Sequence, residues 1–277
     1  MVPRTTNLSY LHSAGKALHL AVAGVVPKAT IVVQSWMLHN SWWTSNRTKA
    51  FFTGFPNDSL LILDMNTDES PSWSQFDSYY GRPWIWCSLE EGGGRSGIYG
   101  NLSVIATTTV TDRRNTSMVG MGYTPESIGH NPIVVDLLAE MAWRTTPLSL
   151  SPSTPTSSSP SIFPPCTNSL DGWIEAFAER RYGWGGEKVK EAWRWLHVGG
   201  YHEIDSGVWS VLEFTPSLSA GVSRAINATA FVNALRCLVE AVEVGEVEEE
   251  LETVRFDLVD VARQVVSDVL VDTLALL

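Results

Sequence analysis

Two of the short apolar runs in this sequence are followed by glutamates, at positions where a carboxylate could do chemistry. Glu126 lies in the segment SMVGMGYTPESIGHN, behind Gly122 and Pro125, which can hold the side chain in a fixed turn. A carboxylate held in this way can attack the anomeric carbon of a sugar. Judged by position alone, a single glutamate in a loop is more commonly a surface charge or a helix cap.

A second acidic segment follows the apolar run PWIWCSL. It contains Glu90 and Glu91, then three glycines and Arg95. Consecutive glycines let the backbone approach a ligand closely, although they can equally form a simple turn. We therefore treat this segment as a candidate part of a binding site.

Aromatic residues gather near the same positions. The chain contains 12 tryptophans, and Trp36, Trp84, Trp86 and Tyr123 lie at or near the carboxyl ends of strand-like runs. Parallel α/β proteins place their sites at these ends of their strands, and flat aromatic rings suit the apolar faces of sugars. Core packing is the favoured interpretation for any one of them, whereas the group favours a ring-binding cleft.

Composition argues against several other classes of function. A formal net charge of −11 without a basic stripe disfavours nucleic acid as a partner. Apolar runs stay shorter than the ~18 residues that a membrane span needs, so we expect no membrane span. The 3 cysteines, Cys87, Cys166 and Cys237, are too scattered for a disulfide framework or a metal cluster. We expect no metal and no cofactor.

Four apolar runs have the length of strands: residues 30–36, 59–65, 83–89 and 117–122. Their spacing is typical of repeated strand-plus-helix units, and their continuous apolar character predicts parallel strands covered on both faces. The helical patterns between them are weak, so closure into a barrel does not follow from these runs alone. Clearer helical spacing marks two flanking segments, from Leu11 to Val25 and from Ile128 to Trp143.

The chain divides near its middle. Residues 149–165 are too rich in Ser, Pro and Thr to pack, and they predict an extended linker. Beyond Leu170 the apolar spacing is helical, and the acidic run Glu246–Glu252 predicts a solvated helix face or turn. We therefore predict an α/β domain over 1–147, a linker over 148–169 and an all-α domain over 170–277.

Several segments, read in order, resemble one known family. They are QSWMLH at 34–39, LILDMNTDESPSW at 61–73, GRPWIWCSLEEGGGRSGIYGNL at 81–102, the segment around Glu126, GWIEAFAERRYG at 172–183 and FDLVDVARQVV at 256–266. The sequence is similar in these segments to the α-N-acetylglucosaminidases of glycoside hydrolase family 89. The likeness covers nearly the whole chain except the linker.

The resemblance implies the second half of a (β/α)8 barrel of the TIM type, followed by an all-helical carboxy-terminal domain. Enzymes of this family hydrolyse terminal α-linked N-acetylglucosamine, as in heparan-sulfate-type glycans, with retention and two glutamates. Glu126 matches the nucleophile. The resemblance and the aromatic pattern together assign six residues to substrate binding: Trp36, Trp86, Cys87, Glu90, Glu91 and Tyr123.

Three departures from the family pattern predict a truncated and impaired hydrolase. The acid/base glutamate of the family belongs just upstream of the segment that corresponds to residues 3–10. Glu90, Glu91 and Gly92 replace a His-Asn-Phe segment, and Ala225 stands where a substrate-facing tryptophan is expected. A raised pKa would let Glu90 or Glu91 serve as a substitute acid.

Two alternatives to an impaired hydrolase stay open. One is a non-catalytic glycan-binding or interaction protein that keeps the aromatic cleft. The other is an incomplete reading of a longer gene that does not fold alone. A homo-oligomer is possible in either case, and a carbohydrate is the expected partner.

Localisation signals conflict. The family and the glycosylation sequons favour a lysosomal, vacuolar or secreted protein, and the sequons lie at Asn7, Asn46, Asn57, Asn101, Asn115 and Asn227. Residues 17–26 resemble the apolar region of a signal peptide, but His19 interrupts them and their spacing is helical. We therefore see no export signal, and the amino terminus looks like a cut inside a larger protein.

Overall fold

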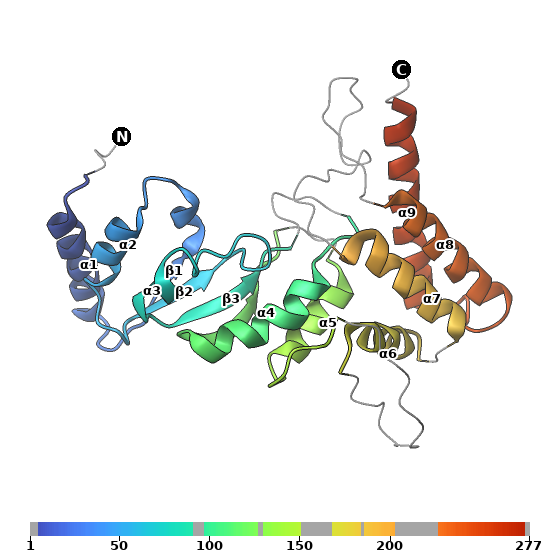
Figure 1. The fold of residues 1–277 in the computed structure, drawn as a ribbon, viewed down its shortest axis with the longest axis horizontal. Helices are drawn as coiled ribbons and strands as arrows, with labels where there is room; N and C mark the ends of the chain where they lie inside the picture. The colour runs from blue at the N-terminus through green and yellow to red at the C-terminus, as the bar shows by residue number, and fades with distance from the viewer. Residues whose placement is uncertain are drawn as a thin grey trace. The chain divides into compact units, whose positions relative to one another are not determined.

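The computed structural model describes residues 5–90, 97–126, 130–150, 168–183, 186–202 and 227–274 (Figure 1). The chain forms two compact units. The first comprises Met1–Leu89 and Thr109–Thr124, and the second comprises Glu90–Thr108 and Pro125–Leu277. The boundaries expected at 147 and 170 stay predictions.

The first unit is built on a four-stranded parallel sheet. Its strands are β1 (Ile31–Gln34), β2 (Leu60–Asp64), β3 (Trp84–Ser88) and β4 (Met118–Tyr123), in the order β1-β2-β3-β4. All four predicted strands are thereby confirmed, as is their parallel direction. The connections between strands contain α2 (Ser45–Phe52), α3 (Asp77–Tyr80) and α4 (Leu102–Asn115), which the sequence pattern indicated only weakly.

The two faces of this sheet differ in burial. Leu60, Ile62, Trp84 and Trp86 are completely buried, and their register places them on one face. On the opposite face Leu61, Leu63 and Ile85 are half-buried, and Val32 is 55% exposed. The expectation that both faces would be covered is therefore met in full only by the first face, since the opposite face is partly exposed at these side chains.

Helix α1 (Leu8–Ala23) confirms the amino-terminal helix predicted from apolar spacing. The side chain of Asn7 caps it by accepting a hydrogen bond from the Tyr10 N–H. Two glycines allow close contact with the end of α2. A Cβ atom at Gly15 would lie 2.3 Å from the Phe51 carbonyl oxygen, and one at Gly54 would lie 2.3 Å from the His12 carbonyl oxygen. Neither position has room for a larger residue.

The second unit is helical. It contains part of α4, then α5 (Pro132–Met141), α6 (Leu170–Tyr182), α7 (Glu187–Leu196), α8 (Ala228–Glu243) and α9 (Glu252–Leu274), with a π-helical turn at His197–Tyr201. The predicted all-helical character beyond Leu170 is confirmed for the described residues. Trp173, Phe177 and Trp193 are buried, and the rings of Phe177 and Trp193 meet edge to face at 4.8 Å.

A buried polar network ties α6, α7 and α9 together. Arg181 donates two hydrogen bonds to Asp257, from Nε to Oδ2 at 2.5 Å and from Nη2 to Oδ1 at 2.6 Å. The Tyr182 hydroxyl donates to Asp257 Oδ2 at 2.8 Å, and the Trp193 indole N–H donates to that hydroxyl oxygen at 3.0 Å. Every heavy polar atom of the Asp257 carboxylate is therefore bonded, as a buried charge requires.

The acidic run after α8 forms a turn, as predicted, and Glu248 and Glu249 are exposed in it. Glu246 departs from the expected solvated face, because its Oε2 accepts a hydrogen bond of 2.8 Å from the Lys188 N–H at the start of α7. Within the described ranges, none of the helices is long and apolar enough to cross a membrane, and no His, Cys, Asp or Glu cluster is suited to a metal ion.

Candidate active site

Trp36 lies in a short 3₁₀ helix, Ser35–His39, directly after β1. Its side chain is 56% exposed, and its ring packs against His39 at 5.1 Å. Ser35, by contrast, is buried, and its hydroxyl donates to Asp64 Oδ1 at 3.2 Å. The hydrogen bond of Ser35 therefore holds the 3₁₀ helix in place, and the side chain of Trp36 is exposed to solvent. An exposed ring of this size can stack on a sugar.

Asp64 ends β2 and organises the loop that follows it. Its carboxylate is buried and accepts hydrogen bonds from the N–H groups of Ser72, at 3.3 Å, and Trp73, at 2.9 Å. Burial raises the pKa of Asp64, and the hydrogen bonds from Trp73 and Ser72 oppose that rise. The sequence analysis did not single out this residue, although an aspartate at the carboxyl end of an apolar strand was a usable signal.

Asp68 connects the same loop to β3. Its Oδ2 accepts a hydrogen bond of 2.6 Å from the Ser88 hydroxyl, and its Oδ1 accepts one of 3.4 Å from the Leu89 N–H. Loss of hydration raises the pKa of Asp68 to about 6, and the two hydrogen bonds limit the rise. A carboxyl group with this pKa exchanges a proton near neutral pH. Asp68 was also missing from the sequence predictions.

Cys87 is buried in β3 and held by backbone contacts to Thr67. Its N–H donates to the Thr67 hydroxyl at 3.2 Å, and its carbonyl accepts from the Thr67 N–H at 2.9 Å. Burial, together with the negative charges of Asp64 and Asp68, raises the pKa of the Cys87 thiol to about 12. The thiol is therefore neutral at physiological pH and does not act as a nucleophile. Its side chain is 1% exposed, so its contact with a sugar stays a prediction.

Trp86 is completely buried, on the face of the sheet that also carries Trp84. The carboxyl group of Asp112, on α4, lies close to the indole groups of Trp86 and Trp73. Burial raises the pKa of Asp112 to about 6. These surroundings favour a packing role for Trp86, and its contact with a sugar stays a prediction.

Tyr123 ends β4, where it is half-buried and pairs in register with Ser88. The next residue, Thr124, donates from its N–H and from its hydroxyl to the Ser88 carbonyl oxygen, at 3.0 and 2.8 Å. These bonds fasten the end of β4 to the end of β3. Within the first unit, the structure thus brings the carboxyl ends of β2, β3 and β4 together, as the sequence predicted.

Glu126 belongs to the second compact unit and is exposed. It follows Pro125, and its N–H donates to the Glu90 carbonyl oxygen at 3.2 Å. Proline and this hydrogen bond together restrict the backbone at Glu126. Glu126 thus lies a few residues beyond a strand, as the sequence predicted, whereas the turn around it stays a prediction because residues 127–129 lie outside the described ranges. An exposed carboxylate can act as a nucleophile or a base.

Glu90 has a different environment from the one expected. It is only 3% exposed, and its Oε1 accepts a hydrogen bond of 2.8 Å from the Asn131 N–H at the start of α5. Asn131 also donates from Nδ2 to the Gly97 carbonyl oxygen at 3.0 Å and accepts from the Tyr201 hydroxyl at 2.9 Å. Glu90 therefore fixes the start of a helix. Glu91 lies outside the described residues, as do Arg95 and Ala225.

Comparisons with known proteins complete these observations. Residues 1–145 match the family model "Alpha-N-acetylglucosaminidase (NAGLU) tim-barrel domain", and residues 173–276 match the model of the NAGLU C-terminal domain. A human protein, "Alpha-N-acetylglucosaminidase", is 29% identical over 276 residues, which cover 97% of this chain and 34% of the relative. The chain thus spans about a third of that relative's length.

Solved structures of a family 89 glycoside hydrolase from Clostridium perfringens share the fold. One of them, in complex with 2-acetamido-1,2-dideoxynojirmycin, has a TM-score of 0.76 at 22% identity. The matched region covers 95% of this chain and 28% of the hydrolase chain. A double variant in complex with "its substrate GlcNAc-alpha-1,4-galactose" gives the same TM-score, 0.76, at 22% identity and the same coverage, 95% and 28%.

Proposed function

This chain belongs to the α-N-acetylglucosaminidase family of glycosidases, and we propose that it supplies the nucleophile side of a site for terminal α-linked N-acetylglucosamine. Glu126 is the proposed nucleophile. The observation that carries the proposal is the exposed carboxylate of Glu126 on a backbone segment shortly after β4, where its N–H is bonded to the Glu90 carbonyl oxygen. The family match supports it independently.

The proposed reaction retains the configuration of the sugar. The Glu126 carboxylate attacks the anomeric carbon, the bond to the leaving oxygen breaks, and an acid group protonates that oxygen. Water then hydrolyses the glycosyl-enzyme while the same acid group, now a base, removes a proton from the water. This chemistry needs the two carboxyl groups about 5 to 5.5 Å apart.

Trp36 is the proposed stacking surface for the sugar, and Tyr123 and Cys87 are proposed to line its pocket. The exposure of Trp36 supports its assignment, since 56% of its side chain is open to a ligand. Glycans of the heparan-sulfate type are the proposed natural substrates. By family, a lysosomal, vacuolar or secreted location is proposed.

The proposed barrel assignment places β1 to β4 in the second half of a (β/α)8 barrel. The half-buried side chains of Leu61, Leu63 and Ile85 support it, because the inner face of such a barrel is filled by side chains from all eight strands. A domain boundary after residue 147 and a linker over 148–169 belong to the same proposal.

Glu90 is a poor substitute for the acid of the family. Its Oε1 already accepts the Asn131 N–H at 2.8 Å, and its side chain is only 3% exposed, so this carboxyl group is engaged in holding α5. Glu90 is therefore not the proposed acid/base.

The test is hydrolysis of p-nitrophenyl N-acetyl-α-glucosaminide by the purified protein. Glu126→Gln is expected to lower kcat by roughly 10³-fold or more, because the variant cannot form the glycosyl-enzyme. The matched control is Glu249→Gln, which makes the same change at an exposed turn and is expected to keep full activity. Equal turnover by Glu126→Gln and wild type would overturn the assignment.

A second candidate function is glycan binding without cleavage. The capping role of Glu90 favours it, because this carboxylate is occupied in holding α5. It predicts saturable binding of N-acetylglucosamine that Glu126→Gln leaves unchanged and that Trp36→Ala weakens. Calorimetry with p-nitrophenyl N-acetyl-α-glucosaminide distinguishes the two functions, since a binding protein shows heat of binding without release of p-nitrophenol.

A further inference from the structure

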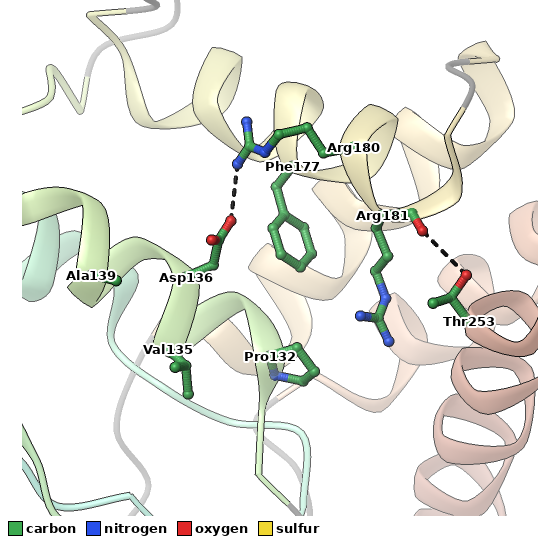
Figure 2. Close-up of a pocket in the computed structure, with 8 residues that line it drawn as sticks. All are labelled: Pro132, Val135, Asp136, Ala139, Phe177, Arg180, Arg181 and Thr253. Carbon is green, nitrogen blue, oxygen red and sulfur yellow. Dashed lines mark hydrogen bonds and ion pairs between the residues drawn. The ribbon is translucent and has the colours of Figure 1, made fainter.

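An open groove of about 550 Å³ lies in the second unit, and neither Glu126 nor Glu90 is among the residues that line it. Helix α5 contributes Pro132, Val135, Asp136 and Ala139, α6 contributes Phe177, Arg180 and Arg181, and α9 contributes Thr253 (Figure 2). Its volume falls in the range of small-molecule sites, roughly 300 to 1,000 Å³.

The two arginines of the groove differ in how firmly they are held. Arg181 is fixed by its two hydrogen bonds to the buried Asp257, and only 12% of its side chain is exposed. Arg180 makes an ion pair with Asp136, from Nη2 to Oδ2 at 3.0 Å, in which the side chains are 44% and 47% exposed. Exposed pairs of this kind contribute little, so another anion can take the place of Asp136.

The position of Arg180 is nevertheless defined. Its guanidinium carbon lies 5.6 Å from the centre of the Trp173 ring, which limits the directions that the cation can take. Figure 2 shows Arg180 and Asp136 facing each other across the groove, with Phe177 between the two arginines. Arg180 is therefore the more exposed of the two cations, and it lies beside an apolar wall.

The wall comes mainly from α5. Pro132, Val135 and Ala139 recur at helical spacing on the side that also carries Asp136, and Phe177 closes the groove from α6. These side chains favour a ligand with an apolar body. The cation at the edge favours a negative head group on the same molecule.

We propose that this groove binds a small amphiphilic anion, with an acidic head group on Arg180 and an aliphatic body along Pro132, Val135 and Phe177. The head group displaces Asp136 from Arg180 when the ligand binds. Carboxylates and sulfate esters share this chemistry. The inference goes beyond the glycosidase proposal and does not depend on it.

The test is calorimetric titration of the purified protein with three ligands of equal tail length, used below their micelle concentrations: nonanoate, octyl sulfate and octyl glucoside. The two anions are expected to bind at least roughly tenfold more tightly than the neutral ligand, as one charge-assisted hydrogen bond implies. Binding of only one anion also supports the site and identifies its head group.

Two variants move the affinity in opposite directions. Arg180→Gln is expected to lower anion affinity to that of octyl glucoside, whereas Asp136→Asn is expected to raise it by up to about fivefold, since the competing carboxylate is gone. Both positions are exposed, so circular dichroism should show native folding. Lys188→Gln, which removes a positive charge on α7 outside the groove, is the matched control and should change nothing.

The proposal is overturned by equal binding of the neutral and anionic ligands, by an unchanged affinity in Arg180→Gln, or by a weaker affinity in Asp136→Asn. Absence of saturable binding by all three ligands overturns it as well. Since the readout is binding and not turnover, these outcomes are independent of the result for Glu126→Gln.

Discussion

Asp257 in the second unit has a different kind of partner from Asp64 and Asp68 in the first unit. Asp257 pairs with Arg181 and accepts a hydrogen bond from Tyr182, which makes it a clamp between α6 and α9. The hydrogen bonds to Asp64 and Asp68 come instead from neutral groups, namely hydroxyls and backbone N–H groups. The contacts of Asp257 join two helices, whereas those of Asp64 and Asp68 join loop residues to the ends of strands.

Arg181→Met should have the largest effect, because it leaves Asp257 buried without its cation. A loss of about 3–5 kcal/mol in the free energy of unfolding is expected, measured by urea denaturation. Arg180→Met removes an exposed partner instead and should cost no more than about 1 kcal/mol. If the two variants were equally stable, Asp257 would not be the clamp described here. The double variant Arg181→Met with Asp257→Leu should recover most of the lost stability.

Asp64→Ala should have an intermediate effect on the first unit. It removes the acceptor for the N–H groups of Ser72 and Trp73 in a buried place, which costs about 1–3 kcal/mol. Asp64→Asn keeps an acceptor oxygen and should cost less, so the difference between the two variants measures the hydrogen bonds. Equal losses in both would instead show that the negative charge matters most.

The stability of the first unit should fall as pH rises through the pKa values of its half-buried aspartates. A carboxylate paired with a cation has the opposite effect, because its contribution to stability is lost as pH falls. Asp68 and Asp112 have pKa values of about 6 in the fold and an ordinary value of 3.8. The folded state therefore holds these protons more tightly, so their contribution is present at low pH and is lost as pH rises through about 6. The double variant Asp68→Asn with Asp112→Asn removes both of these protonation sites. The melting temperature of this variant should therefore change less than that of the wild type between about pH 4.5 and 7.

The smallest expected effect concerns Cys87. Burial and two carboxylates raise the pKa of the Cys87 thiol to about 12, so the thiol is uncharged at about pH 8. Because iodoacetamide reacts with the thiolate, it should leave Cys87 unmodified in the folded protein at that pH. Unfolding in urea should expose it to labelling, as peptide mass spectrometry can show. Labelling of Cys87 in the native state would contradict the buried environment of the strand ends.

The strands could be predicted because their apolar runs are bounded and evenly spaced, and the same spacing indicated that they run parallel. The open face could not be predicted from the runs, since Val32 and Leu61 are as apolar as the buried residues beside them. What covers a strand is set by neighbours in three dimensions, and a continuous apolar run does not identify them.

The candidate site was predicted in part. The places of Glu126 after β4 and of Trp36 after β1 follow from the apolar runs. The exposure of Trp36 does not, because core packing was the favoured interpretation for any one of the aromatic residues. Trp86 could have been separated from Cys87 in advance, because adjacent residues of a strand point to opposite faces. The roles of Asp68 and Glu90 could not be predicted from the sequence. Their hydrogen-bond partners, Ser88 and Asn131, are distant in sequence and come close only in the folded chain.

The contact between Gly15 and Gly54 has a genetic consequence. Every missense change at a glycine codon adds at least a Cβ atom, and at either position that atom would lie 2.3 Å from a carbonyl oxygen of the opposite segment. We therefore expect natural populations that carry this gene to show silent changes at codons 15 and 54 and almost no amino-acid variation there.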